Sequence, residues 1–314
     1  MALYADLRLS RCEMNAFPNM MQRANLPAWR GKKKAVFGVD RDSYSMAVTD
    51  EEYHSDRDYV SSTQLKSILK TPKHFLAAVQ GAGKDKQVLE FGRLAHMAVF
   101  EPWRFEDVVL PYDGEFDRRL RSCKTFIADH PNHTVIGQDK FDALLSMRKA
   151  VREHYFRGRT LGEWFDEGES EKAIYFVERV TNVKCRVKVD NLHPEFIFDL
   201  KSTVDVRPAA FNGSVHAYHY DLSAFMYQTG VQYFTGEERP FVFIAVEKEA
   251  PYSVMTYTAG DSLLDNGAQK FEDGLNRLNH ARAHDSWPGY AGDYVLEVDR
   301  WHEYQSNHDI LASA

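Results

Sequence analysis

The most constraining feature of this chain is a pair of short strand-like runs, each followed by an aspartate. Residues 185–189 alternate apolar and basic side chains before Asp190, and the apolar run 196–198 comes directly before Asp199. Such runs predict β-strands, with each aspartate at a strand end. Side chains two positions apart on a strand share a face, so Asp199 and Lys201 are expected to project together. Two strands would therefore bring two carboxylates and a lysine to one sheet.

The rest of the chain carries strand and helix signals that predict an α/β fold, with a mixed central sheet flanked by helices and a helical N-terminal part. The first helical signal, at residues 61–64, has the composition of a capping box, and Pro72 is expected to close that helix. Further helices are expected at residues 139–156, 220–234 and 261–284. Further strands are expected at residues 173–177, 241–246 and 253–257.

Two aspartates and a lysine on neighbouring strands suit a hard divalent cation. Mg²⁺ binds carboxylate, water and phosphate oxygens, and a lysine beside the metal could orient or help to deprotonate an attacking water. This combination is typical of an enzyme that cuts phosphodiester bonds. The Asp-x-Lys triplet alone has little weight, because a chain of this length and charge contains about one by chance. On the following helix, Ser223, Tyr227 and Gln228 form either a wall of the site or ordinary hydrogen-bonded core.

In order and spacing, these segments resemble the PD-(D/E)XK nucleases, and most closely the RecE-type exonucleases (exodeoxyribonuclease VIII) of phages and prophages. The resemblance covers roughly residues 58–305. It implies a PD-(D/E)XK exonuclease domain over residues 58–314, preceded by an N-terminal extension or arm over residues 1–57. The segments that carry it are 62–66, 91–102, 170–171, 186–190, 199–203, 220–227, 287–290 and Trp301.

The resemblance implies a 5′-to-3′ exonuclease that degrades one strand of linear double-stranded DNA and leaves a 3′ overhang. It also implies that His96, Asp190 and Asp199 bind two Mg²⁺ or Mn²⁺ ions, with the Leu200 carbonyl as a further ligand. Lys201 would contact the nucleophilic water or the scissile phosphate. A metal pair lowers the pKa of bound water and neutralises charge on the leaving oxygen during in-line attack. Without the resemblance, a lone helical histidine is more often structural than a ligand.

Several positions leave their roles open. Glu171 either binds metal, directly or through water, or is an exposed strand residue. Val189 stands where the family name expects a proline, a change that affects backbone shape rather than a ligand. On the helix after the core lysine, Tyr227 matches the family tyrosine, whereas Ser223 occupies the position of the family glutamine. Gln228 would have to supply the missing amide, although a residue one position on points about 100° away on a helix.

Composition excludes several classes of protein. The chain has 314 residues, 44% of them hydrophobic, which is enough for a globular protein with a sizeable core. Its cysteines, Cys12, Cys123 and Cys185, indicate no disulfide framework, Cys-based zinc site or four-cysteine iron–sulfur cluster. No apolar run is long enough to span a bilayer, and the N-terminus lacks a signal-peptide core. We therefore expect a protein of the bacterial host cytoplasm without membrane contact.

The net charge of −7 does not favour DNA binding, because duplex affinity comes largely from Lys and Arg. Basic clusters at residues 30–34, 118–124 and 148–152 are more often solvated faces than phosphate tracks. A homo-oligomeric ring with a basic channel would reconcile the two, and the resemblance implies such a ring. It also implies double-stranded DNA ends as substrate and a single-strand annealing protein as partner.

Two alternatives to this function stay open. A nuclease of the same fold could act on single-stranded or branched DNA, or cut internally. A catalytically silent module could instead bind DNA or serve as a scaffold in a recombination complex, although it would not need Asp190, Asp199 and Lys201 together.

Overall fold

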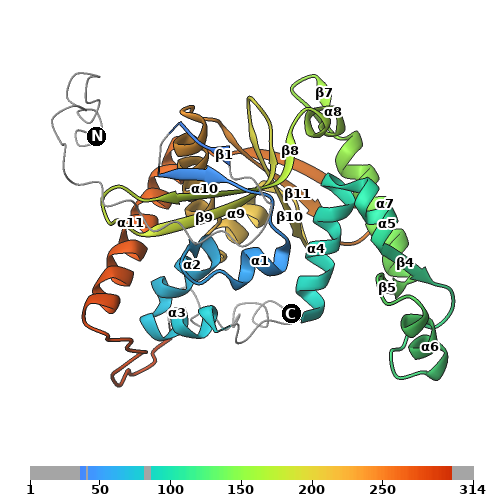
Figure 1. The fold of residues 1–314 in the computed structure, drawn as a ribbon, viewed down its shortest axis with the longest axis horizontal. Helices are drawn as coiled ribbons and strands as arrows, with labels where there is room; N and C mark the ends of the chain where they lie inside the picture. The colour runs from blue at the N-terminus through green and yellow to red at the C-terminus, as the bar shows by residue number, and fades with distance from the viewer. Residues whose placement is uncertain (1–35, 40–41, 81–85, 299–314) are drawn as a thin grey trace, which may run out of the picture.

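A mixed sheet of eight strands lies at the centre of the computed structural model, which describes residues 36–39, 42–80 and 86–298. The strand order is β1-β2-β8-β9-β10-β11-β12, and β3 pairs with β9 outside this path. Figure 1 shows β1 and β8 to β11 of this sheet at the centre of the molecule. The pairs β10–β11 and β3–β9 are parallel, and the others are antiparallel. The predicted mixed α/β class is confirmed. The strands are β1 (Val36–Phe37), β2 (Ser43–Ser45), β3 (Val60–Ser61), β8 (Glu169–Val177), β9 (Lys184–Leu192), β10 (Ile197–Thr203), β11 (Phe241–Glu247) and β12 (Val254–Thr258).

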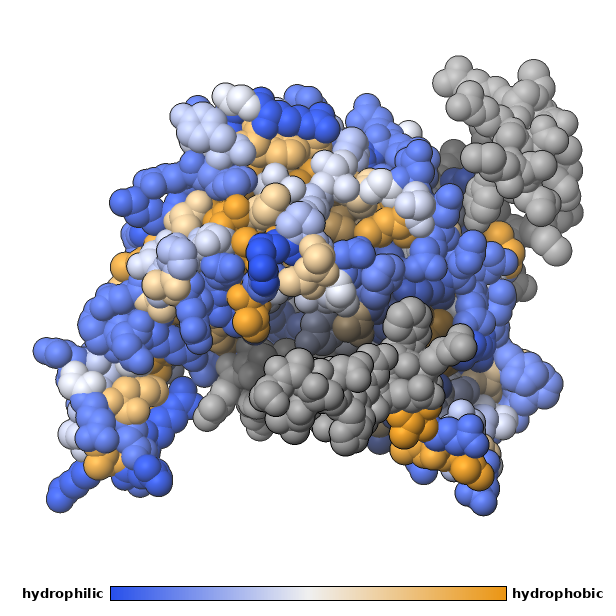
Figure 2. Space-filling model, turned by 180° about the vertical axis from the view of Figure 1, so that it is seen from behind, coloured by the Kyte–Doolittle hydropathy of each residue, from blue (hydrophilic) through white to orange (hydrophobic). Residues whose placement is uncertain are grey.

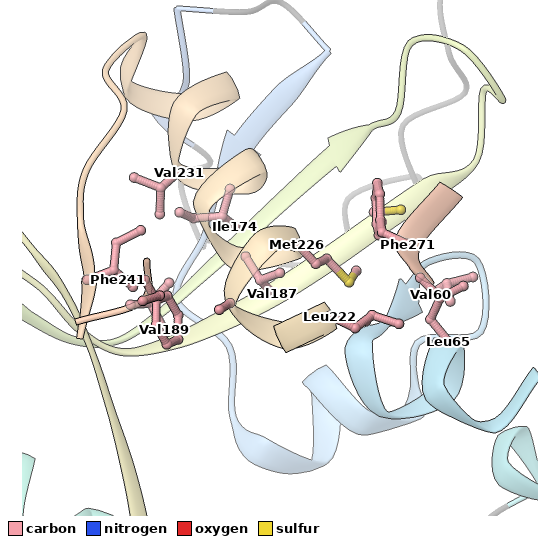
Figure 3. Close-up of a cluster of buried hydrophobic side chains, with 14 of the residues drawn as sticks. Val60, Leu65, Ile174, Val187, Val189, Leu222, Met226, Val231, Phe241 and Phe271 are labelled. Carbon is pink, nitrogen blue, oxygen red and sulfur yellow. The ribbon is translucent and has the colours of Figure 1, made fainter. Parts of the chain in front are cut away.

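One face of the sheet carries the larger hydrophobic core. Alternate strand residues such as Val187, Val189 and Phe241 point to this side, where Leu222 and Met226 pack close to them (Figure 3). Burial of such apolar surface is the main favourable contribution to folding. The helices that contribute to this core are α2 (Ser62–Lys70), α3 (Pro72–Val79), α9 (Pro208–Ala217), α10 (Tyr220–Thr235) and α11 (Asp261–Ala283).

The opposite face carries a second core, built from the strand residues that alternate with the first set. Phe198, Leu200 and Ile244 point to this side and pack with helix residues such as Leu94 and Leu144. The helices of this layer are α4 (Lys86–Phe100), α5 (Pro102–Val108), α7 (Gln138–Glu153) and α8 (Leu161–Asp166). The two cores therefore separate an α10 face of the sheet from an α4 face.

Small elements extend from the α4 face. Strands β4 (Val109–Tyr112) and β5 (Thr134–Gly137) form a parallel pair, with α6 (Arg121–Asp129) between them in the chain. Figure 1 shows these three elements projecting away from the central sheet, below α5 and α7. Strands β6 (Tyr155–Phe156) and β7 (Arg159–Thr160) form a short antiparallel pair before α8.

The described part of the N-terminal segment extends the central sheet by β1 and β2. β2 pairs with β8, and α1 (Asp50–Ser55) lies on the α4 face, where the ring of its buried Tyr53 is 6.4 Å from that of Tyr175 on β8. This part of the expected extension over residues 1–57 is therefore packed against the domain that follows it. The domain boundary itself stays a prediction.

The strands and helices expected from periodicity are present, and the capping box is confirmed. Ser61 Oγ accepts a hydrogen bond from the Gln64 backbone, and the Gln64 side chain accepts one from Ser61. One expectation was incomplete, because Pro72 also begins α3, as its first residue. Another was wrong: Asp190 and Asp199 lie inside strands rather than at their ends, because polar residues after Asp199 continue to pair with β11.

The surface seen from behind is mainly hydrophilic, with hydrophobic residues in separate patches (Figure 2). Among the described helices, none combines the length and the apolar character needed to cross a membrane.

Candidate active site

Glu171 and Asp190 lie at a shared interruption of the β8–β9 ladder. Ser170 and Asn191 form a registered pair, and so do Lys172 and Val189. Between these two pairs, Glu171 and Asp190 lie opposite each other but are not registered as a pair. Glu171 has a φ of 52°, in the left-handed region that residues with a β-carbon rarely adopt. The usual alternation of sides is broken here, since the Ser170 hydroxyl donates to the Phe100 carbonyl of α4 at 2.9 Å while Glu171 also lies near α4. Both acidic side chains therefore lie on the α4 face.

The β9–β10 ladder ends at the same place. Registered pairs join Asn191 and Leu192 to β10, but the next position is not registered. The Leu200 backbone N–H donates instead to Asp190 Oδ2 at 2.8 Å. Because β8 occupies the other edge of β9, β3 must pair with β9 on the edge that β10 has left. β10 and β3 therefore pair with successive parts of the same edge of β9, and the chain enters α2 directly from β3.

His96 on α4 joins the two acidic residues in a compact cluster. One ligand atom from each of the three lies within 4.8 Å of the others, and His96 Nδ1 is 3.1 Å from Asp190 Oδ2. Burial opposes the charge on His96, but Asp190 outweighs burial and raises the pKa of His96. Burial likewise opposes the charge on Asp190, yet His96 chiefly keeps the pKa of Asp190 below its usual value. Burial, and then Asp190, raises the pKa of Glu171.

Asp199 and Lys201 project from the same side of β10, as the strand period predicts. Asp199 Oδ2 and Lys201 Nζ form an ion pair, and Leu200 between them is buried in the core of the α4 face. Burial, together with Asp190, raises the pKa of Asp199. Burial opposes the charge on Lys201, but the two aspartates outweigh it and raise the pKa of Lys201, so the ammonium keeps its proton. The Leu200 carbonyl, an expected metal ligand, accepts from Lys201 Nζ at 3.4 Å.

Tyr227 on α10 lies near the same group. Its hydroxyl has a hydrogen bond with the side chain of Ser62, at the start of α2. Burial raises the pKa of Tyr227 well above its ordinary value, and the charges of Asp199 and Asp190 add to this. The hydroxyl therefore stays protonated and can donate a hydrogen bond within the site.

Gln228, the adjacent residue, is not brought to this group. Its Nε2 donates to the Arg239 carbonyl at 2.9 Å, two residues before β11 begins. Asp199 is registered with Phe243, farther along β11. The offset of about 100° between successive helix residues accounts for the different directions of Tyr227 and Gln228.

The sequence of residues 61–297 matches a family model described as a PDDEXK-like domain of unknown function (DUF3799). This match spans well over half of the chain. The chain belongs to this PDDEXK-like family.

Two solved structures are similar to this PDDEXK-like protein. One, named "Putative exonuclease" from Eubacterium rectale, has 17% sequence identity and a TM-score of 0.54, and the match covers 86% of this chain and 100% of that chain. At this identity the likeness concerns the fold alone. The other, a phage related exonuclease from Haemophilus somnus 129PT, has 12% identity and a TM-score of 0.32, with 73% of this chain and 96% of that chain covered. No curated protein matches the sequence.

The residues present fit a divalent metal, which PD-(D/E)XK nucleases use. An imidazole nitrogen and carboxylate oxygens suit Mn²⁺, and the carboxylates also suit Mg²⁺. Two ammonium groups already stand where a cation would neutralise the acids. Lys188 Nζ is 2.6 Å from Glu171 Oε2, and Lys201 Nζ contacts Asp199. These contacts show that both carboxylates are placed to bind positive charge.

Sequence reasoning missed three residues of this region. Lys188 forms ion pairs with both Glu171 and Asp50, the first residue of α1. Its place two residues before Asp190 was a signal, but we interpreted it only as strand alternation. Asp50 lay in the expected extension and carried no signal. Lys66 lies in the segment 62–66 of the resemblance, which predicts no role for it, and its ammonium lies over the ring of Tyr220, as that of Lys201 does.

Proposed function

We propose that this protein is a metal-dependent exonuclease that degrades one strand of linear double-stranded DNA from its 5′ end and leaves a 3′ overhang. The observation that supports it most is the cluster of His96, Glu171 and Asp190 beside the ion pair of Asp199 and Lys201, in a chain of the PDDEXK-like family. The name of the similar structure from Eubacterium rectale agrees with an exonuclease. Strand polarity and the 3′ overhang rest on the resemblance to RecE-type exonucleases.

In this proposal, His96, Asp190 and Asp199 hold Mg²⁺ or Mn²⁺, and the Leu200 carbonyl offers a further oxygen. Glu171 closes the site on the β8 side and binds the metal directly or through water. A bound divalent metal acidifies a water molecule and neutralises charge on the phosphate. His96 Nδ1 lies 3.1 Å from Asp190 Oδ2, and this nitrogen could bind a metal only after losing the proton that it shares with Asp190.

Lys201 acts in this reaction as a hydrogen-bond donor. In the metal-free site, the two aspartates raise its pKa and it holds its proton at neutral pH. With a metal bound by the Asp199 carboxylate, the Lys201 ammonium would be free to contact the attacking water or the scissile phosphate. Tyr227, whose hydroxyl also stays protonated, offers a second donor on the same side.

Cleavage of end-labelled DNA tests the proposal. The purified protein and its Lys201→Ala variant are incubated with Mg²⁺ and linear duplex DNA labelled at either the 5′ or the 3′ end, beside a closed circular duplex. We expect early release of the 5′ label from linear DNA, an intact circle, and no release by the variant. Early release of the 3′ label would overturn the polarity. An intact duplex with both Mg²⁺ and Mn²⁺ would contradict the enzyme and favour a silent scaffold.

The same assay separates the substrates that a nuclease of this fold could take. Single-stranded and branched DNA of the same sequence serve as competing substrates. Preference for the blunt duplex end supports the proposal. Faster cleavage of single strands or branches, or opening of the circle, would replace it with a nuclease of different specificity.

The proposed assembly is a homo-oligomeric ring that encloses the DNA, with a single-strand annealing protein as partner on the new overhang. A closed cyclic assembly would retain its substrate while one active site follows the digested strand. Light scattering should give one discrete mass that is a multiple of the 36.2 kDa chain. A monomer at working concentrations would contradict the ring without affecting the nuclease proposal.

A further inference from the structure

Lys66 is a half-buried lysine near the active site with no anionic partner among the described residues. It lies on the second turn of α2, and its Nζ is 5.3 Å from the centroid of the Tyr220 ring. Lys201 Nζ is 5.1 Å from the same centroid, so the two ammonium groups are no farther apart than the sum of these distances. A partly buried charge normally has a partner that offsets its lost hydration. Lys66 has instead an aromatic ring and a second cation.

The acids around Lys66 are already paired with other lysines. Asp199 is bound by Lys201, and the buried Asp221 accepts from Lys270 Nζ at 2.6 Å. The exposed Lys70 follows Lys66 by one turn of the same helix. Asp199 and Asp221 are therefore each neutralised by another lysine, and neither of them neutralises the charge of Lys66.

We propose that Lys66 binds a phosphate of the DNA strand, next to the phosphate that is cut. This inference rests on the proposed function, because it takes Lys201 to lie at the scissile phosphate. A phosphate would supply the anion that Lys66 lacks. Lys66 and Lys201 lie over the same Tyr220 ring, and successive phosphates along a strand are close enough for each lysine to contact one of them. A metal ion would be repelled here, and a neutral ligand would leave the excess charge in place.

The protonation of Lys66 agrees with an incoming anion. Burial, and then the positive charge of Lys201, lowers the pKa of Lys66 to about 7. Without an anion beside it, the charged form of Lys66 is therefore destabilised. A phosphate beside Lys66 would favour the charged form. Residues that bind the DNA backbone position the strand without reading its sequence.

DNA affinity measured without cleavage tests this role. A short duplex with a 5′-phosphate and the same duplex with a 5′-hydroxyl are titrated in Ca²⁺, and a gel shows whether the DNA stays intact. The variants are Lys66→Ala, Lys66→Arg and, as the matched control, Lys70→Ala. Manganese binding by each variant reports whether the metal cluster is still formed.

We expect Lys66→Ala to weaken DNA binding about tenfold and to reduce the salt dependence by about one counterion. Lys66→Arg should restore most of the affinity, and Lys70→Ala should change it less than twofold. Loss only with the 5′-phosphate would assign Lys66 to the terminal monoester, and loss with both duplexes would assign it to an internal diester.

Unchanged affinity and salt dependence in Lys66→Ala would overturn the inference. A parallel loss of manganese binding, not restored by arginine, would also overturn it, because Lys66 would then only support the fold. Failure of the proposed function looks different. The parent protein would bind but never cut DNA, while the effect of Lys66→Ala on binding would remain.

Discussion

The two sides of the candidate site use opposite chemistry. The metal side, defined as His96, Glu171 and Asp190, lies on the α4 face and gathers an imidazole and two carboxylates within 4.8 Å. The lysine side, defined as Lys66, Asp199 and Lys201, lies on the α10 face and has two ammonium groups for one carboxylate. The metal side is arranged to receive a cation, which Asp199 would also contact, and the two ammonium groups of the lysine side are arranged to receive an anion.

The difference follows from the face of the sheet to which each aspartate points. The side chains of β9 alternate regularly from Cys185 to Val189, and this alternation places Asp190 opposite to Val189, on the α4 face. On β10, Asp199 lies between Phe198 and Leu200 of the α4 core and points to the α10 face. Residues of a registered antiparallel pair share one face, so the end of the β9–β10 ladder before these two positions allows the aspartates to point to different faces.

The largest effect is expected from Asp190→Asn, which keeps the size of the side chain but removes its charge. The variant should lose manganese binding and cleave DNA about 10³-fold more slowly or worse, because a catalytic metal contributes several kcal/mol to transition-state stabilisation. Calorimetry with Mn²⁺ and the end-label assay measure the two losses. Asp166→Asn, a change in an exposed carboxylate on α8, is the matched control.

Lys201→Ala sharpens this result, because it removes a cation from the other side. It should cleave as poorly as Asp190→Asn while still binding Mn²⁺. Equal loss of manganese binding in both variants would mean that the two sides form one inseparable unit, and the comparison would fail.

The next largest effect concerns pH, and its sign differs for metal binding and for stability. Asp190 holds the pKa of His96 above its ordinary value, so a proton competes with the metal for Nδ1. The affinity for Mn²⁺ should fall about tenfold per pH unit below that raised pKa and level off above it. Without metal, the protonated pair stabilises the fold below the ordinary histidine pKa of about 6.5. That contribution is lost as the pH rises through the raised pKa.

Calorimetry and thermal unfolding between about pH 6 and pH 9 measure these opposite trends. His96→Gln should bind metal more weakly and should remove much of the pH dependence of both quantities. If the metal-free protein became more stable as the pH rose over this range, the ion pair between His96 and Asp190 would be excluded as a stabilising contact.

A smaller effect is expected from Asp50→Asn, in the segment before the family match begins. Asp50 and Glu171 share Lys188, and Lys188 is half-buried between them. Without Asp50, Lys188 is left with Glu171 alone and competes more strongly with a metal there. Loss of such an outer partner typically costs 10- to 100-fold in metal affinity or activity, and we expect about tenfold.

Glu51→Gln, at the next and exposed position of α1, removes the same charge without touching Lys188 and is the control. The cleavage rates of Asp50→Asn and Glu51→Gln are compared, provided that the two variants are equally stable. Equal rates would show that α1 only covers the sheet and has no influence on the metal side.

Much of the lysine side could be predicted from the sequence, and less of the metal side. The period of two along a strand places Asp199 and Lys201 together, and periodicity located β9, β10 and α10. Alternation also places Asp190 on the face opposite to Val189, but its meeting with Glu171 and His96 depends on a backbone φ of 52° at Glu171 and on packing between distant elements, which no local pattern encodes. The contact between Asp50 and Lys188 joins residues 138 positions apart.

The smallest effect is expected from Gln228→Ala, because this residue belongs to neither side. Its amide donates to the Arg239 carbonyl near the start of β11, so its loss should lower the free energy of unfolding by about 1 kcal/mol and leave cleavage within about twofold of the parent. Tyr227→Phe, the adjacent change, should slow cleavage severalfold with the fold intact, since its hydroxyl is the donor near Asp199. Chemical denaturation and the end-label assay separate the two variants. A rate loss in Gln228→Ala at unchanged stability would mean that the amide leaves Arg239 when DNA binds, and that the lysine side is larger than the free protein indicates.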